Sequence, residues 1–235
     1  MVFEAGLGMS GVCWGLVAPG VAERARTVVY DRAGYAASSY DSSPRTLARL
    51  ASDLGRVLRS LDGPFVLVGH SWGGPIARLA AGDFDVRALV LVDPSDERAD
   101  EFFTRATARR MAVAGPLTRT LAATGIYRAA ARIGSALPPD LFTQFRDECF
   151  GRRVGRVYAD EVRHFLPGLA SLRAAPPDLG DLPVTVISAG RGARDSLRAA
   201  HAAFLDARHV VATDAGHNIM FEQPSTVVEE ILRHV

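Results

Sequence analysis

The chain has 235 residues, 48% of them hydrophobic, so a single domain can bury about 70–75% of the surface that its unfolded chain exposes. Its formal net charge is only +1, which gives no electrostatic reason to expect nucleic acid or a membrane surface as a partner. Neither a signal peptide nor a segment of membrane-spanning length is recognisable. Cys13 and Cys149 have no metal-type neighbours and are typical of a reducing compartment, so we expect a cytoplasmic protein.

Short apolar runs alternate with helical patterns along the chain. We expect strands at residues 2–5, 27–31, 65–69, 87–93, 183–188 and 208–213. Continuous apolar strands that alternate with helices predict an α/β fold, in which helices cover both faces of a mostly parallel sheet.

Helices are expected between these strands. Leucines and valines recur at three- and four-residue steps after Ser43, which predicts a helix with Ser43 as its N-cap and Pro44 at its first position. A second helix should end at Gly82, a third should cover residues 195–206, and the last should begin at Pro224.

Residues 95–177 break the alternation. They are helical in pattern, rich in arginine and punctuated by glycine and proline, and they contain no strand-like run. We interpret them as a helical cap insertion within one domain that spans residues 1–235.

Glycines follow the first expected strand at positions 6, 8 and 11, in the spacing G-x-G-x-x-G, and Asp31 comes 20 residues after the last of them. This pattern is the fingerprint of dinucleotide binding, so an NAD(P)-dependent oxidoreductase is one alternative. Two features oppose it. Glu4 lies inside what would be the most buried strand, and the alternative gives no role to Ser71 or His217.

The sharpest chemical signal is FVLVGHSWGG, residues 65–74, which contains G-x-S-x-G around Ser71. In this motif a tight strand-to-helix turn holds the serine in a strained conformation with its hydroxyl exposed. Side chains two positions to either side would collide, which explains Gly69 and Gly73. The apolar strand before the motif and the helix after it make it far more specific than the bare pattern.

A serine hydroxyl needs a base, and the base needs a carboxylate that orients it. The base candidate is His217, in the short loop between the last strand and the last helix, at the sheet edge where α/β proteins place their sites. Two carboxylates qualify, Asp93 at the end of the fourth strand and Asp195 beyond the fifth. Both give the chain order Ser, Asp, His. His164, His201, His209 and His234 are expected to be structural or simply solvated, on surface helices or at strand ends.

Over nearly its full length the chain resembles the α/β-hydrolase superfamily. The matching segments are EAGLG, YDRAG, GHSWGG, LVLVDP and AGHNIMFEQP. In that family the acid most often lies about three residues after a glycine past the penultimate strand. Counted from Gly190 this position is Ala193, and Asp195 comes two residues late. Other members carry the acid where Asp93 stands, and we favour Asp93. The family usually has two strands before the first one expected here, so we expect either that the native chain starts upstream or that the sheet is shortened.

The resemblance implies an oxyanion hole formed by the main-chain N–H groups of Leu7 and Trp72. It implies a serine hydrolase that cleaves a carboxylic ester, lactone or thioester through an acyl-enzyme on Ser71, without metal or organic cofactor. The partner is then a small carbonyl compound with an apolar acyl part. The same fold also serves carbon–carbon bond hydrolysis, acyl transfer, cyclisation and non-catalytic binding, so these alternatives remain. A serine nucleophile argues against epoxide or haloalkane chemistry, for which the family uses aspartate.

Large apolar side chains in the insertion are candidates for an acyl pocket, although we expect most of them to pack the insertion onto the sheet. They are Phe102, Phe103, Met111, Tyr127, Phe142, Phe145 and Tyr158.

Overall fold

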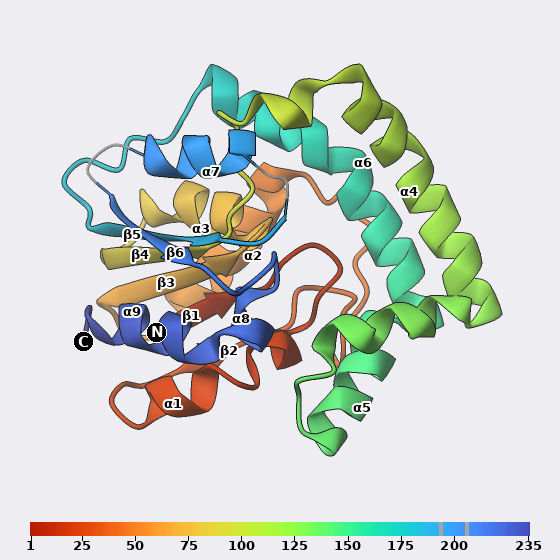
Figure 1. Ribbon diagram of the computed structural model, residues 1–235, viewed down its shortest axis with the longest axis horizontal. Coiled ribbons are helices and arrows are strands. Elements are labelled where there is room, and N and C mark those ends of the chain that lie inside the picture. Colours follow the sequence, from red (N-terminus) through yellow and green to blue (C-terminus); the bar gives the residue numbers. More distant parts are fainter. Residues whose placement is uncertain (193–194, 205–206) are drawn as a thin grey trace.

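The computed structural model describes residues 1–192, 195–204 and 207–235. A six-stranded parallel sheet runs through it in the order β2-β1-β3-β4-β5-β6 (Figure 1). Every predicted strand overlaps an observed one. The strands are β1 (Val2–Glu4), β2 (Val28–Val29), β3 (Phe65–His70), β4 (Val86–Val92), β5 (Val184–Ala189) and β6 (Arg208–Ala212).

Helices cover both faces of this sheet, as the sequence predicts. One face carries α2 (Leu47–Arg59), α3 (Gly73–Ala81) and α7 (Asp195–Ala202). The other carries the short 3₁₀-helix η1 (Gly11–Trp14), α1 (Ala18–Ala22), α8 (Ile219–Glu222) and α9 (Pro224–Leu232).

The strand residues alternate between the two cores. Val66 and Val68 of β3 face the side of α1 and α9, whereas Leu67 faces α2 and α3. Both sets are almost fully buried, which accounts for the continuous apolar character of the central strands.

Residues between β4 and β5 form the helical insertion. Its elements are η2 (Asp100–Phe103), α4 (Arg105–Thr124), η3 (Ile126–Gly134), α5 (Pro139–Cys149) and α6 (Arg152–Ala174). The two long helices α4 and α6 lie side by side beyond the sheet (Figure 1). Phe165 and Leu169 of α6 reach the core on the α2 and α3 side, so the insertion packs directly on the sheet domain. In the part of the chain that the structure describes, no helix is both long and apolar enough to cross a membrane.

The start of α2 differs from the prediction. The helix begins at Leu47, and Thr46 is its N-cap, whose side chain accepts a hydrogen bond from Arg49 N–H. The residues before it are held out of the helix by a distant partner, because Arg45 N–H donates to Asp160 of α6 at 2.9 Å. A long-range contact therefore moves the boundary three residues beyond the predicted N-cap, Ser43.

Two other expectations concern the C-terminal third. The predicted helix at 195–206 is observed to Ala202, and its expected end at 205–206 lies outside the described residues. His201 is not a surface residue. It is fully buried, where its ring contacts the Ser188 hydroxyl and the Pro94 carbonyl at 2.7 and 2.8 Å.

Candidate active site

The turn between β3 and α3 carries Ser71 in a conformation that L-residues rarely adopt. Its φ is +51°, and the residue sits between the carboxyl end of the strand and the first turn of the helix. The turn is tied to the neighbouring strand, since Ser71 N–H donates to Val92 O at 3.1 Å and Ser95 N–H donates to Ser71 O at 2.9 Å. These bonds hold the strained serine in place from both sides.

The glycines that flank this turn are required by close backbone approach. A Cβ on Gly69 would lie 2.5 Å from the carbonyl oxygen of Gly73. A Cβ on Gly73 would lie 2.8 Å from Ala5 O and even closer to Glu4 O. The turn after β3 is therefore pressed against the end of β1, and any side chain at these two positions would force them apart.

Three predicted site residues meet above this turn. The Ser71 hydroxyl lies 3.0 Å from His217 Nε2, and His217 Nδ1 lies 2.6 Å from Asp93 Oδ2. A carboxylate can only accept, so Nδ1 carries the ring hydrogen and Nε2 is left to accept from the serine hydroxyl. Asp93 is buried, and its other oxygen accepts from Ala189 N–H at 3.0 Å. The side chain is thus fixed by the adjacent strand, β5.

The His217 loop is held by two residues to which the sequence assigned no role. His70, the last residue of β3, contacts the His217 carbonyl through Nε2 at 3.0 Å, and it must donate because a carbonyl accepts. Glu222 of α8 accepts from Gly216 N–H at 3.2 Å and also pairs with Arg191. The imidazole is therefore positioned through its backbone as well as through Asp93.

The second candidate acid lies elsewhere. Asp195 is the first residue of α7, its side chain is 86% exposed, and it pairs with Arg198. The Asp93 side chain is 3% exposed and contacts the histidine directly. The position that the family pattern would assign, Ala193, lies outside the described residues.

The two residues expected to form an oxyanion hole flank the serine. Leu7 lies in the loop after β1, and Trp72 follows the serine directly. Among the described residues, neither main-chain N–H has a hydrogen-bond acceptor. Gly6 lies beside the nucleophile, since a Cβ there would be 3.4 Å from Ser71 Cβ. The loop that carries Leu7 therefore lies against the turn that carries Ser71 and Trp72.

The glycine turn does not have the surroundings of a dinucleotide site. Only the four-residue η1 follows it, and the Asp31 carboxylate is already engaged by the turn itself, because it accepts from Gly11 N–H at 2.7 Å. A pyrophosphate site of that type requires a helix N-terminus at the turn. Among the described residues, no group of three or more His, Cys, Asp or Glu side chains is placed to hold a metal ion.

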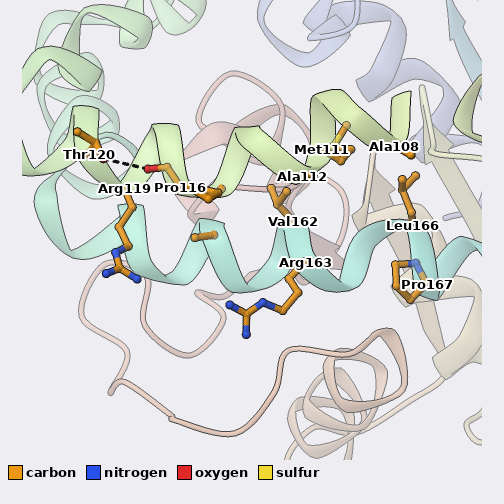
Figure 2. A pocket seen from close by; sticks show the side chains of 12 residues that line it. Ala108, Met111, Ala112, Pro116, Arg119, Thr120, Val162, Arg163, Leu166 and Pro167 are labelled. Atoms are coloured by element: carbon orange, nitrogen blue, oxygen red, sulfur yellow. Dashed lines mark hydrogen bonds between the residues drawn. The ribbon is translucent and has the colours of Figure 1, made fainter. Parts of the chain in front are cut away.

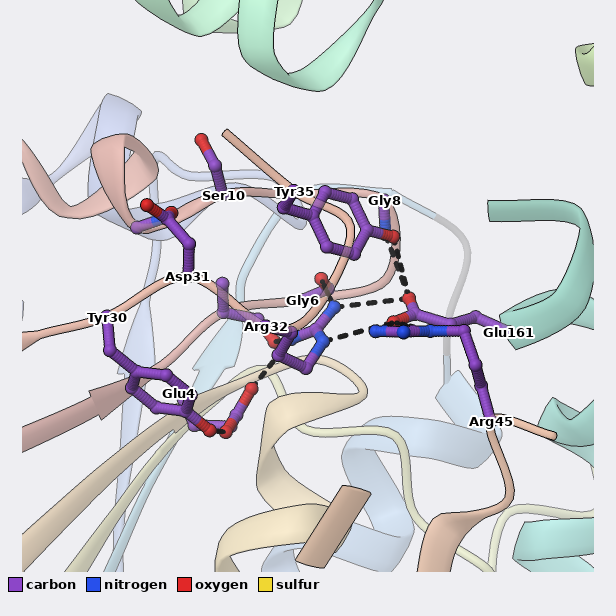
Figure 3. A network of polar contacts seen from close by, with 12 residues as sticks. Glu4, Gly6, Gly8, Ser10, Tyr30, Asp31, Arg32, Tyr35, Arg45 and Glu161 are labelled. Atoms are coloured by element: carbon purple, nitrogen blue, oxygen red, sulfur yellow. Dashed lines mark hydrogen bonds and ion pairs between the residues drawn. The ribbon is translucent and has the colours of Figure 1, made fainter. Parts of the chain in front are cut away.

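A buried polar network lies behind the loop after β1 (Figure 3). Arg32, from the YDRAG segment, makes ion pairs with Glu4 of β1 at 2.6 Å and with Glu161 of α6 at 3.1 Å. Arg45 also pairs with Glu161, at 3.0 Å. All four side chains are at most 5% exposed. The sequence did not predict this cluster, although it offered two signals: Glu4, an acid inside an apolar strand, and the loop pair Asp31-Arg32.

The ionisation of the two acids in this network follows from their surroundings. Burial raises the pKa of Glu4, and the Arg32 charge offsets this only in part. Burial alone would also raise the pKa of Glu161, but Arg32 and Arg45 together bring it below its usual value. Glu161 is therefore a carboxylate at neutral pH and the counter-ion of both arginines.

A groove of about 580 Å³ lies between α4 and α6, but it is separate from this site (Figure 2). Met111, Val162 and Leu166 line it together with Arg119 and Arg163, and none of Ser71, His217 and Leu7 borders it.

The candidate pocket residues of the insertion have different surroundings. Phe102 and Phe145 are buried in the cores, and Phe103 lies under Arg173. Tyr158 contacts the loop after β1, where a Cβ on Gly8 would lie 2.8 Å from its ring.

Comparison with known proteins identifies the family. Residues 1–230 match the model of the alpha/beta hydrolase family. An uncharacterised protein of Bacillus subtilis strain 168 is 32% identical over 99 residues, which are 40% of this chain and only 39% of that relative. The chain therefore belongs to the alpha/beta hydrolase family.

Solved structures show the same fold at low identity. An esterase from Exiguobacterium antarcticum is 16% identical, with a TM-score of 0.78, over 99% of this chain and 90% of that one. The enol-lactonase from Burkholderia xenovorans LB400 is 21% identical, with a TM-score of 0.73, over 99% of this chain and 89% of that one. These structures share the fold expected of the family that the chain matches.

The glycine contacts yield a stability prediction. Gly73→Ala should lower the free energy of unfolding by about 2–4 kcal/mol, because the added methyl group meets backbone oxygens that cannot move aside. Gly82→Ala is the matched control, since Gly82 has right-handed φ and ψ and nothing within 4 Å of the added carbon. It should change stability by less than about 1 kcal/mol. Urea denaturation measures both, and equal losses would contradict the close approach of β1 and α3.

Proposed function

We propose that this member of the alpha/beta hydrolase family is a serine hydrolase that cleaves a carboxylic ester, lactone or thioester. The observation that carries the proposal is the continuous hydrogen-bonded chain from Ser71 Oγ through His217 to Asp93, at 3.0 and 2.6 Å. In this arrangement a weak nucleophile, a base and a buried carboxylate are in contact in the order that acyl transfer requires.

In the first half-reaction the Ser71 oxygen attacks the carbonyl carbon while His217 Nε2 takes the hydroxyl proton. The imidazolium that forms is stabilised by Asp93, which stays ionised and keeps the ring in one tautomer. Collapse of the tetrahedral intermediate breaks the bond to the leaving group. His217 returns its proton to the leaving oxygen or sulfur, and the acyl group remains on Ser71 as an ester.

The developing negative charge needs donors that are in place before reaction. We assign this role to the N–H groups of Leu7 and Trp72, which flank the serine and have no other acceptor among the described residues. Removal of one such donor in other enzymes costs on the order of 3 kcal/mol in the transition state.

In the second half-reaction water must reach the acyl-enzyme. The His217 side chain is 35% exposed, so water can approach Nε2 from solvent while Asp93 stays buried behind the ring. His217 then removes a proton from that water and releases the acid. This access favours hydrolysis over transfer to a second substrate, which would require water to be excluded.

The substrate class follows from the nucleophile and its surroundings. Attack by a serine oxygen on an epoxide would give an ether, which water cannot hydrolyse, so turnover requires a carbonyl carbon. Tyr158 of the insertion packs against Gly8, the residue after Leu7, and the Tyr127 ring lies 6.4 Å from the Tyr158 ring at an interplanar angle of 50°. We infer that the insertion acts as a cap and presents this aromatic surface to an apolar acyl part. An esterase and an enol-lactonase with the same fold agree with this class of substrate.

The proposal predicts covalent labelling of Ser71. A fluorophosphonate probe should react with the folded protein in 1:1 stoichiometry, and intact-mass spectrometry should find the adduct on the peptide that contains Ser71. Ser71→Ala should fold normally and remain unlabelled. Wild-type protein that is folded and unreactive, or equal labelling of the alanine variant, would contradict the proposal.

A pair of substitutions tests the acid. Asp93→Asn should lower kcat for an aryl ester by about 10⁴-fold, because an amide no longer holds the imidazole in the required tautomer. Asp195→Asn changes an exposed side chain and should leave kcat within about twofold of wild type. Steady-state kinetics decide between them, and the reverse order of the two effects would show that Asp195 is the acid.

A further inference from the structure

Glu161 lies on the insertion helix α6, far in sequence from every residue of the proposed catalytic machinery. We propose that Glu161 is a positioning residue: through Arg32 it sets the oxyanion loop, residues 5–8, so that the Leu7 N–H faces the reacting oxygen. The inference rests on the proposed serine hydrolase function for its kinetic consequences, although the clamp itself is a structural statement that can be tested separately.

The first step is the contact between Arg32 and the loop backbone. Arg32 Nη1 donates to Ala5 O at 2.6 Å, and Nη2 donates to Gly6 O at 2.7 Å. The peptide bond between Gly6 and Leu7 is trans, so its N–H points opposite to its C=O. Because Arg32 holds the Gly6 carbonyl on one side, the Leu7 N–H must point to the other.

We infer that this other side is the catalytic side, because the loop lies against the turn that carries Ser71. A Cβ built on Gly6 would lie 2.7 Å from His70 Nδ1 and 3.4 Å from Ser71 Cβ, which places the loop directly against the nucleophile turn. A rotation of the Gly6–Leu7 peptide by half a turn would exchange the two groups. The carbonyl would then face the developing oxyanion and oppose it, so the orientation of one peptide decides whether the loop helps or hinders the reaction.

Arg32 is fixed in this position by its other hydrogen bonds. A guanidinium has five N–H donors, and all five are used here. Nη1 also donates to Glu4 at 2.6 Å, while Nε and Nη2 donate to the two oxygens of Glu161, each at 3.1 Å (Figure 3). Lysine has three donors around one nitrogen and could not reproduce this planar arrangement.

Glu161 is itself held in place by several hydrogen bonds. Its carboxylate is fully buried and accepts from Arg45 at 3.0 Å and from the Tyr35 hydroxyl at 2.9 Å. It also lies 3.5 Å from Gly8 N, at the far end of the oxyanion loop. The loop is therefore held at both ends. Arg32 donates hydrogen bonds to the carbonyls at its start, and the Glu161 carboxylate lies close to the Gly8 N–H at its end.

It follows that the oxyanion loop depends on the insertion. Glu161 is the only member of the Glu4, Arg32, Arg45 and Glu161 cluster that α6 supplies. Without it Arg32 would keep only Glu4 as an ion-pair partner, and Arg45 would lose the partner it has in this cluster. Buried charge without a partner is strongly unfavourable. Arg32 would therefore reorient or become hydrated, and it would lose its hydrogen bonds to the loop carbonyls. A docked insertion thus completes the site as well as covering it.

The test uses Glu161→Gln in the full-length protein. The amide has the same shape but presents donors to a guanidinium that can only donate, so Arg32 loses at least one of its two bonds to this residue. We expect kcat for an aryl ester to fall by about 10- to 1,000-fold, bounded by the loss of one oxyanion donor. KM should change less than about threefold, because ground-state binding does not use this N–H. The inhibition constant of a trifluoromethyl ketone, whose hemiketal oxyanion occupies the same position, should rise in parallel with the loss of kcat/KM.

Glu97→Gln is the matched control. Glu97 makes a buried, two-bond ion pair with Arg78 at 2.7 and 2.9 Å, and this pair contacts no residue of the oxyanion loop. Its loss should lower thermal stability while kcat and the inhibition constant stay within about twofold of wild type. A merely structural role for Glu161 would give the same result as this control. If Glu161→Gln does not fold, Glu161→Asp takes its place, because it keeps the charge but withdraws the carboxylate by one methylene; the same parallel change is expected.

A crystal structure of the variant separates the two proposals. The clamp predicts that Gly6 O leaves Arg32 and that the Gly6–Leu7 peptide rotates, whether or not the protein hydrolyses esters. Wild-type protein that never forms a Ser71 adduct, together with a rotated peptide in the variant, would refute the hydrolase proposal and support the clamp. A folded variant with an unrotated peptide and wild-type inhibition overturns the clamp, even where Ser71 chemistry is established.

Discussion

The close approach of two backbones, at the end of β1 and at the turn after β3, is the constraint on which the candidate site depends. Gly73 lies against the carbonyls of Glu4 and Ala5 with no room for a side chain. This contact brings the serine turn beside the loop that carries Leu7. Parallel strands end at the same edge of the sheet, so β4 and the loop after β6 deliver Asp93 and His217 to the same place. The close contact at Gly73 and the parallel order of the strands thus bring the site residues to one place.

Much of this arrangement could be predicted because its signals are local in sequence. Apolar runs locate the strands, and a serine between two glycines after such a run identifies the turn whether or not the rest of the fold is known. His217 could be found for the same reason, since a short loop after a predicted strand must lie at the carboxyl edge of the sheet.

What could not be predicted depends on pairs of residues that are distant in the chain. The sequence could only weigh Asp93 against Asp195, because exposure decides between them and exposure is a property of the packed molecule: one is buried against β5 and the other lies on the surface. The contact between Arg32 and Glu161 spans 129 positions, and the start of α2 is displaced by a contact that spans 115. His201 was misplaced for the same reason, since a helix pattern does not reveal that Ser188 and Pro94 enclose one of its side chains.

The buried charges link the insertion to the chemistry of the proposed site. An apolar cluster could pack α6 onto the sheet, as Phe165 and Leu169 do, but it could not dictate which way a peptide group faces. A guanidinium with all five donors engaged does so, because each bond has a fixed direction. In this view the insertion contributes an aromatic surface through Tyr158 and a charge through Glu161. The first would act on the substrate and the second on the enzyme's own backbone.

We propose that the serine, the imidazole and two main-chain N–H groups converge on one reacting carbonyl. The most direct measurement is a crystal structure of the protein after reaction with a trifluoromethyl ketone. We expect a covalent bond from Ser71 Oγ to the ketone carbon, with the resulting oxygen about 2.7–3.1 Å from the nitrogens of both Leu7 and Trp72. An adduct on another residue, or an oxygen that points away from both nitrogens, would contradict it.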